Sequence, residues 1–375
     1  MQEFDVIIVG AGAVGAALAY RLAPHRRVLI LERETQPGYH STGRSAAHYT
    51  DTIGGVEVQA LSEETRRFIE NPPEGFTDSP LLIKRAVLVL VGHDTGERHF
   101  DEQGLAHVMG RILFPIDFEQ CLEHCPVLRA DKVARGIWEP EAGDMDVHAI
   151  HTGYLRQARR AGAELVCDAQ VLAMERHEGV WQLETKSGTF RAPLVVNCAG
   201  AWGDVLAAMA GAQPVGLQPM RRTAFTFKGP KGLDCTSWPL TADDGENFYF
   251  KPQAGLIMGS LADEAPSDPC DAQPEELDLA QAAHNIMEWT TLEIVRMESR
   301  WAGLRSFVAD RLPVTGFDPT IEGFFWNVGQ GGAGIQTSAG LSSYAAATIL
   351  GHELSDNLAA AGLTVETLSP SRLSG

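Results

Sequence analysis

The sequence predicts an α/β chain of two domains, one built on a parallel sheet and the other an α+β unit with an antiparallel sheet. A continuous apolar run at 6–9 leads into closely spaced glycines and a helix of small residues, and such a run suits a strand buried on both faces of a parallel sheet. Alternation at 221–227 and 248–250 indicates antiparallel strands. A length of 375 residues is enough for about two domains.

The N-terminal segment carries a phosphate-binding pattern. Gly10, Gly12 and Gly15 have the spacing that lets a chain turn sharply, approach a pyrophosphate and pack helix on strand. A second apolar run at 28–31 ends at Glu32, where a carboxylate can accept hydrogen bonds from a ribose and repel a 2′-phosphate. The pattern predicts a Rossmann-like dinucleotide-binding domain and leaves NAD and FAD both open. An ordinary glycine turn that only relieves steric strain is the alternative.

Composition excludes several classes of ligand. The net charge of −19 repels nucleic acid and anionic lipid, so we expect neither as a direct ligand.

No stretch reaches about 18 apolar residues, and the N-terminus lacks the positive region of a signal peptide. We therefore expect no integral membrane segment.

The six cysteines are scattered along the chain. Only Cys121 and Cys125 are close, with His124 between them and no second ligand pair downstream. Thiols in ordinary packing are favoured over a metal site, and we expect no bound metal. Unpaired cysteines fit a reducing cytoplasm, which is the predicted location.

Further elements are predicted from apolar periodicity and turn residues. The polar loop 36–50 is followed by 51–55, whose paired glycines would let it hinge as a lid. The predicted helices begin near Ala13 and cover 58–69, 118–124, 148–161, 203–210, 277–291 and 335–350. The predicted strands cover 6–9, 28–31, 82–91, 165–167, 171–173, 181–185, 194–197, 221–227, 248–250, 256–259, 301–308 and 323–328, with a turn at 311–316. We assign 1–80, 145–216 and 304–375 to the first domain and 81–144 and 217–303 to the second.

Five segments in the observed order resemble a known family: 40–46 (HSTGRSA), 197–202 (NCAGAW), 303–306 (GLRS), 310–316 (DRLPVTG) and the glycine loop 329–334. Together with the N-terminal pattern they resemble the D-amino-acid oxidase superfamily of FAD-dependent oxidoreductases. Within it, the segments resemble those of the bacterial FAD-dependent D-arginine dehydrogenases. The resemblance covers essentially the whole chain and implies a Rossmann-like FAD-binding domain beside an antiparallel-sheet substrate-binding domain.

The resemblance implies that FAD is bound non-covalently. A helix starting near Ile335 would direct N–H groups at the flavin pyrimidine oxygen, where hydride transfer leaves negative charge. The implied cofactor-binding residues are Gly10, Gly12, Ala13, Val14, Gly15, Glu32, Arg33, Ser41, Thr42, Ser45, Ala46, Ala47, Val171, Ala199, Gly200, Trp202, Gly303, Arg305, Gly331, Gly332, Gly334, Ile335 and Gln336.

On the substrate side, the resemblance implies catalytic roles for Arg222, Tyr249, Arg305 and His48. Two arginines and a tyrosine hydroxyl make a fork that binds a carboxylate with bidentate geometry. A solvated strand residue is the alternative for Arg222, a buried ion pair for Arg305, and a structural hydrogen bond for His48. The implied substrate-binding residues are Thr50, Ile53, Val87, Gly332 and Gln336.

Two positions depart from the pattern of the D-arginine-active relatives. Val87 stands where they have a glutamate that holds the cationic side chain, and Ile53 replaces a tyrosine. Loss of the carboxylate removes a charge-assisted bond of about 1.5–3 kcal/mol. Apolar D-amino acids are therefore the expected substrates, while Lys84 and Arg85 leave an acidic side chain as an alternative.

The expected reaction is oxidation of a D-amino acid to an imino acid, which water hydrolyses to a 2-oxo acid and ammonia. Oxidation of a 2-hydroxy acid or of a secondary amine such as sarcosine is one alternative, and a non-catalytic dinucleotide-binding protein is another. The expected partners are the small-molecule D-amino acid and an electron acceptor, a quinone or another acceptor in preference to oxygen. Attachment to the inner face of the membrane through that acceptor is an alternative to a purely cytoplasmic location.

Overall fold

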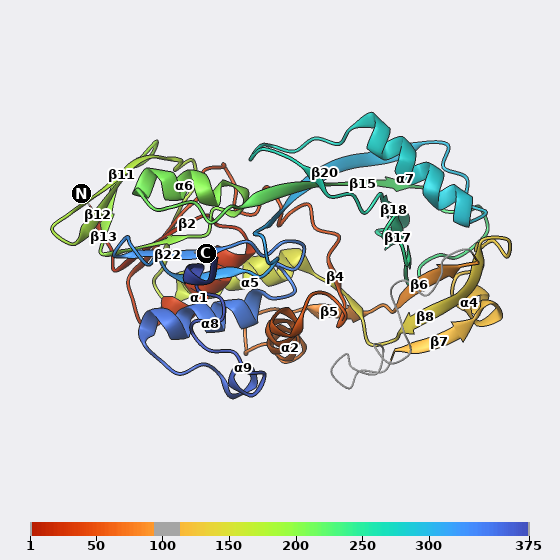
Figure 1. The fold of residues 1–375 in the computed structure, drawn as a ribbon, viewed down its shortest axis with the longest axis horizontal. Coiled ribbons are helices and arrows are strands. Elements are labelled where there is room, and N and C mark those ends of the chain that lie inside the picture. Colours follow the sequence, from red (N-terminus) through yellow and green to blue (C-terminus); the bar gives the residue numbers. More distant parts are fainter. Residues whose placement is uncertain (1, 94–112, 374–375) are drawn as a thin grey trace.

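The computed structural model describes residues 2–93 and 113–373, which form an elongated molecule with a large sheet toward each end (Figure 1). A six-stranded sheet lies at one end and a nine-stranded sheet at the other, and two smaller sheets have four and three strands. The two termini of the described chain lie at the end that holds the six-stranded sheet (Figure 1). The predicted α/β class is confirmed.

The six-stranded sheet is parallel except at one edge. Its strands are, in spatial order, β10 (Glu164–Val166), β3 (Val28–Leu31), β2 (Val6–Val9), β14 (Leu194–Asn197), β22 (Phe324–Val328) and β21 (Val314–Phe317). The edge strand β21 alone in this sheet runs antiparallel to its neighbour β22. Every residue of β2 is buried, as expected for a strand that is covered on both faces.

Each face of this sheet packs into its own core. Ile8 and Ile30 belong to the core under helices α1, α5 and α8, while Ile7 and Leu29 belong to the core on the opposite face. The elements on the first face are α1 (Ala13–Leu22), α5 (Val147–Arg160), α8 (Ser338–Leu350), α2 (Val56–Glu70) and α9 (Asp356–Ala360). Those on the second face are α6 (Gly203–Ala210) and the four-stranded sheet of β1 (Gln2–Glu3), β13 (Gly188–Ala192), β12 (Val180–Thr185) and β11 (Val171–His177). Short 3₁₀ helices cover η1 (Gly200–Trp202) and η2 (Pro370–Leu373).

The nine-stranded sheet is mostly antiparallel, with one parallel pair between β16 and β6. Its strands are β19 (Ala265–Pro266), β15 (Gln218–Phe227), β18 (Leu256–Ser260), β17 (Tyr249–Gln253), β16 (Leu240–Asp243), β6 (Val87–Gly92), β8 (Val133–Glu139) and β7 (Phe114–Asp117), with β20 (Met297–Phe307) paired to β15. A three-stranded sheet of β4 (His48–Tyr49), β9 (Gly143–Met145) and β5 (Leu82–Lys84) lies between the two large sheets (Figure 1).

One face of the nine-stranded sheet is closed and the other carries polar side chains. Phe225, Phe250 and Leu88 face a core shared with α7 (Glu276–Trp289) and α4 (Phe118–His124). Tyr249 and Arg222 alternate with these residues along β17 and β15, so they point to the opposite face. The substrate-facing residues predicted from the sequence therefore lie on the face that the helices leave open.

The structure corrects three predicted elements. The single strand predicted at 82–91 is two strands in different sheets, β5 and β6. The last long helix begins at Ser338 and not at Ile335, because 333–337 form a turn in which the Thr337 N–H donates to Ala333 O (2.8 Å) and the Ser338 N–H to Ile335 O (3.1 Å). The predicted turn at 311–316 is partly wrong, because 314–317 pair with β22 as an edge strand. The domain boundaries stay a prediction. In the described part of the chain, no helix has the length and apolar composition needed to cross a bilayer.

Candidate cofactor and substrate site

The turn between β2 and α1 has no room for side chains at two of its glycines. Gly10 has φ +109°, and a Cβ there would lie 2.3 Å from the carbonyl oxygen of Cys198. A Cβ on Gly15 would lie 2.0 Å from the carbonyl oxygen of Gly10. Both contacts are far shorter than van der Waals distance, so the glycines let β2, α1 and the end of β14 meet closely.

The N-terminus of α1 opens toward the segment that follows β3. The Ala13 N–H donates to Thr42 Oγ1 at 3.0 Å, and a Cβ on Gly12 would lie 3.2 Å from that same oxygen. Thr42 thus caps α1 in place of the glycine at the N-cap position. This end of the helix carries the positive pole of the dipole, which suits a phosphate.

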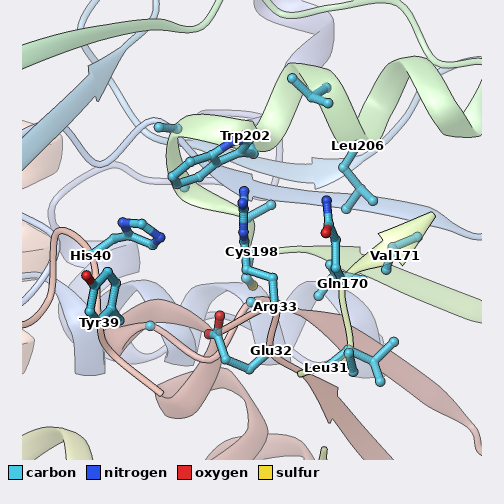
Figure 2. A pocket seen from close by; sticks show the side chains of 18 of the residues that line it. Leu31, Glu32, Arg33, Tyr39, His40, Gln170, Val171, Cys198, Trp202 and Leu206 are labelled. Carbon is cyan, nitrogen blue, oxygen red and sulfur yellow. The ribbon is translucent and has the colours of Figure 1, made fainter. Parts of the chain in front are cut away.

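Glu32 is held rigidly at the end of β3. Its side chain is buried, with 7% of the residue exposed. Oε2 accepts the Ala11 N–H at 2.9 Å and Oε1 accepts the Glu34 N–H at 3.0 Å. A carboxylate oxygen can accept more than one hydrogen bond, so Glu32 can still receive ribose hydroxyls in the cleft that it lines (Figure 2).

Aromatic and cationic groups form the wall of this cleft opposite Glu32 (Figure 2). The Arg33 guanidinium lies 4.5 Å from the ring centre of Trp202, and the His40 ring lies 4.7 Å from it on a tilted plane. His40 Nε2 is 2.9 Å from Glu34 Oε1. The cleft is further lined by Leu31, Tyr39, Gln170, Val171, Cys198, Ala199 and Leu206. Burial raises the pKa of the Cys198 thiol to about 12, which keeps it protonated and unreactive.

A second cleft continues from the first at the α1 N-terminus. The two share Gly12, Ser41, Thr42, Cys198, Gly200 and Ala201, so they form one continuous groove. Of the residues predicted from the sequence, the second cleft is lined by Gly12, Ala13, Val14, Ser41, Thr42, Ser45, Ala46, Gly200, Arg222, Tyr249, Gly303, Arg305, Gly331, Gly332, Gly334 and Ile335. The groove therefore runs from Glu32 to the three residues of the predicted carboxylate fork.

The glycine loop at 329–334 packs against the strand that carries Arg305. The Gly331 N–H donates to Ser306 O at 2.9 Å, and a Cβ on Gly331 would lie 2.1 Å from the ring of Phe307. A Cβ on Gly332 would lie 2.9 Å from Cζ of Arg305, so the guanidinium rests against the bare backbone of the loop. The glycines here give room to an arginine as well as to a cofactor.

The three groups of the fork differ in how they are held. Arg222 Nε donates to Asp263 O at 2.6 Å, and its Nη2 lies 3.6 Å from Glu264 Oε1. The Arg305 guanidinium makes no hydrogen bond to any residue within 2–93 or 113–373. Burial and the nearby charge of Arg222 lower the pKa of Arg305. Arg222 and Arg305 therefore repel each other beside Tyr249, and an anion bound between them would relieve this repulsion.

Several predicted residues lie outside both clefts. The Gln336 amide is used internally: Nε2 donates to Thr50 O at 2.7 Å and Oε1 accepts the Thr50 N–H at 3.0 Å. These contacts favour a structural role for both residues. Gly15 lies behind the turn, and Ala47, at φ +58°, follows the cleft residue Ala46. Neither cleft is lined by His48, Ile53 or Val87.

A buried carboxylate that the sequence reasoning missed holds the predicted lid. Glu139 ends β8 with 5% of the residue exposed. Its Oε1 accepts the Asp51 N–H at 2.6 Å, and its Oε2 accepts the Thr50 hydroxyl at 2.7 Å. Burial raises the pKa of Glu139, and the charge of Asp51 adds to the effect. An acidic residue at the end of the apolar segment 136–138 was the available signal.

The cations that could have served an acidic substrate are used elsewhere. Lys84 forms an exposed ion pair with Glu141 at 2.8 Å, and Arg85 binds Asp144.

Cys121 and Cys125 are both buried, and the His124 ring stacks on Trp138 at 3.8 Å. Across 2–93 and 113–373 no group of three or more His, Cys, Asp or Glu side chains is placed to hold a metal ion.

The groove fits an extended dinucleotide that carries a redox ring at its inner end. Four features lie along the groove: a buried carboxylate, a glycine turn with no space for side chains, a helix N-terminus and a cationic fork. The chain belongs to the FAD dependent oxidoreductase family (DAO), whose sequence profile matches residues 5–348. FAD is its cofactor, and the protein is an FAD-dependent oxidoreductase.

Some relatives of the chain have about its own length, and others are much longer. It is 25% identical over 354 residues to glycine oxidase from Geobacillus kaustophilus, with 90% of each chain covered. It is 29% identical over 268 residues to mitochondrial dimethylglycine dehydrogenase from Homo sapiens, covering 68% of this chain and 30% of that protein. The chain therefore spans about a third of the length of that relative.

Solved structures share the fold. The crystal structure of L-proline dehydrogenase from P. horikoshii superposes with a TM-score of 0.82 at 20% identity, covering 100% of this chain and 98% of the other. The glycine oxidase structure from Geobacillus kaustophilus gives a TM-score of 0.81 at 22% identity, with 97% and 99% coverage. These matches confirm the predicted fold, in which a Rossmann-like part is joined to a sheet-rich part.

Replacing Trp202 with alanine is expected to weaken FAD binding by about three- to tenfold, since an aromatic contact contributes about 0.5–1.5 kcal/mol beyond its buried area. Trp202 forms the cleft wall opposite Glu32 and is itself held by Arg33 and His40. Titration of the apoprotein with FAD, followed by flavin fluorescence, measures the change. Trp289→Ala is the control, because Trp289 packs against Phe248 in the core of the nine-stranded sheet. Equal losses in both variants would contradict a role for Trp202 in the cofactor cleft.

Proposed function

We propose that this protein oxidises a D-amino acid to its imino acid, which water hydrolyses to a 2-oxo acid and ammonia, and that it favours apolar side chains. The observation that carries the proposal is the meeting of Arg222, Tyr249 and Arg305 at the inner end of the cofactor groove. Bound FAD supplies the chemistry by accepting a hydride from the substrate Cα.

The residues of the chain bind and orient the substrate. A carboxylate bound by Arg305 and Arg222 would receive charge-assisted hydrogen bonds and relieve the repulsion between the two guanidinium groups. The Tyr249 hydroxyl would add a third contact that fixes the direction of the carboxylate plane. Holding one end of a small substrate in this way limits the orientations of its Cα and supports catalysis by positioning.

The register of the sheet supports the preference for apolar side chains. Tyr249 pairs with Ala242, which pairs with Val89, and Leu240 pairs with Val87. Paired residues share a face, so these four aliphatic residues extend from Tyr249 across the open face of the sheet. Glu139 pairs with Val87, but its carboxylate is already bound by 50–52. A guanidinium side chain would therefore meet no free carboxylate along this row.

Small or secondary amines are the second candidate substrates. The relatives named above are called glycine oxidase, dimethylglycine dehydrogenase and L-proline dehydrogenase, and another relative is called sarcosine dehydrogenase. Their names point to amino acids that lack a large side chain or carry a substituted nitrogen. The resemblance of the sequence to D-arginine dehydrogenases supports D-amino acids as the first candidates. An electron acceptor such as a quinone is also proposed.

Anaerobic reduction of the bound flavin tests the proposal. The purified holoenzyme is mixed with D- and L-amino acids, glycine, sarcosine, proline and 2-hydroxy acids, and loss of flavin absorbance is followed. We expect D-leucine and D-methionine to bleach the flavin fastest and D-arginine slowly. Reduction by sarcosine or L-proline alone would overturn the D-amino-acid proposal in favour of a secondary amine. Absence of reduction by every carboxylate-bearing compound would overturn the carboxylate fork.

Glu139→Gln is expected to raise KM for the substrate by about threefold to tenfold with little change in kcat, since a lost hydrogen bond costs about 1 kcal/mol. A glutamine can accept the Asp51 N–H but cannot accept the Thr50 hydroxyl with its NH₂ group. The segment that follows β4, close in the chain to the cleft residues Ser45 and Ala46, is then held less firmly. Steady-state kinetics measures the effect, with Glu141→Gln as the control because Glu141 pairs with Lys84 at the surface. An unchanged KM in Glu139→Gln would show that this contact does not shape the substrate site.

A further inference from the structure

Asp144 is the centre of a buried charge cluster that joins the two halves of the site. Its Oδ1 lies 3.0 Å from His48 Nδ1 and 2.5 Å from Lys251 Nζ, and its Oδ2 accepts a hydrogen bond from Arg85 Nε. The side chains of His48 and Lys251 are 5% and 4% exposed. Such burial makes these contacts effective, since little solvent screens the charges.

The partners of Asp144 come from opposite sides of the groove. His48 begins β4, three residues after Ser45 at the cofactor cleft. Lys251 lies on β17 two residues beyond Tyr249, and so on the same face of the sheet. Arg85 also donates to Thr236 O at 3.1 Å and to the carbonyl of Trp238, just before β16 begins. One carboxylate thus links the cofactor-side segment to the strands of the substrate-side sheet.

The charges of the cluster are interdependent. Burial by itself would raise the pKa of Asp144, but the hydrogen bond from His48 and the charge of Lys251 hold it well below the ordinary value. Burial lowers the pKa of His48 and of Lys251, and the hydrogen bonds to Asp144 oppose that change. Asp144 is therefore an ionised acceptor that offsets the cations Lys251 and Arg85, and removing it alone would leave both of them uncompensated.

We propose that Asp144 is a positioning residue that fixes the segment from Ser45 to Thr50 relative to β17, and thereby sets the distance between the cofactor end of the groove and the fork at Tyr249. This inference rests on the proposed function. A misplacement of about 1 Å in a reacting pair can cost about 100-fold in rate, so a rigid link between the two sides has a direct catalytic consequence. Asp144 itself lines neither of the two cofactor clefts.

A double variant separates positioning from charge compensation. Asp144→Asn leaves Lys251 and Arg85 as two buried cations, whereas Asp144→Asn with Lys251→Met restores the net charge of the cluster. We expect the double variant to fold, to bind FAD with wild-type affinity by flavin fluorescence, and to bind benzoate within threefold of wild type, because the fork is intact. Its limiting rate of flavin reduction in stopped-flow measurements is expected to fall by about 10- to 100-fold. A wild-type rate in the double variant would overturn the proposal and leave Asp144 as a charge-compensating residue.

Lys251→Met alone provides a second test that keeps the carboxylate with His48 and Arg85. It removes the contact to the strand of Tyr249, so we expect a smaller loss in the reduction rate, about fivefold to tenfold, with FAD binding unchanged. An unchanged rate would overturn the proposed link through β17. Failure of wild-type holoenzyme to be reduced by any amino acid would instead count against the proposed function, and the benzoate titration distinguishes the two failures.

Discussion

Arg305→Met is expected to raise KM for the amino-acid substrate by about 10- to 150-fold while FAD stays bound, because it removes a charge-assisted bond of about 1.5–3 kcal/mol. Arg305 faces the groove without a hydrogen-bonded partner among the described residues, and its guanidinium rests against Gly332. Methionine has a similar length and can keep the packing against the loop. The loss should therefore fall on carboxylate binding rather than on folding.

Steady-state kinetics and the flavin spectrum of the purified variant measure the two parts of this expectation. Arg221→Met is the matched control, since Arg221 lies next to Arg222 but points to the opposite face, where it binds Glu275 and Asp278. That variant should lose stability without a large change in KM. A normal KM in Arg305→Met, or an equal rise in Arg221→Met, would show that the carboxylate fork is misassigned.

Gly15→Ala is expected to weaken FAD binding by at least about 100-fold and to destabilise the fold by about 1–3 kcal/mol, the usual cost of overpacking. Alanine is the best helix former, so helix propensity alone would predict a gain in stability. The new methyl group would instead lie 2.0 Å from the Gly10 carbonyl oxygen and would push α1 away from β2. The N-terminus of the helix would then move from its place against Thr42.

FAD titration of the apoprotein and thermal unfolding of the variant test this result. Gly55→Ala is the control, because Gly55 precedes α2 at the N-cap position and its added Cβ would meet only the Glu57 carboxylate, at 3.4 Å. This control should bind FAD as tightly as wild type. Tight FAD binding by Gly15→Ala would mean that the β2–α1 turn relaxes at little cost and that the close approach is not required.

The elements around the glycine turn were largely predictable because their pattern is local. The spacing of Gly10, Gly12 and Gly15 encodes a strand, a turn and a helix within a few residues, and the structure contains these elements there. The position of Glu32 was predictable because it lies at the end of a single strand–helix–strand unit. The start of the last helix was predicted less well, because a turn at 333–337 and a helix share the same small residues.

The substrate side was predicted through the resemblance and not through local pattern. Arg222, Tyr249 and Arg305 come from three strands, and the register of the sheet brings them into one cleft. The spacing of Glu139 and Lys251 along the chain does not show which distant residues they contact. Each was missed for that reason.

The sequence by itself determined the fold class, the glycine turn after the first buried strand and the acid at the end of the second, because these depend on neighbours in the chain. Only the tertiary structure decided which polar groups are already used. Gln336 pairs with the backbone of Thr50, and Glu139 holds the segment after β4. Lys251 meets Asp144 across 107 residues of sequence. Such contacts form between side chains that packing brings together, and burial then fixes their charge state and geometry.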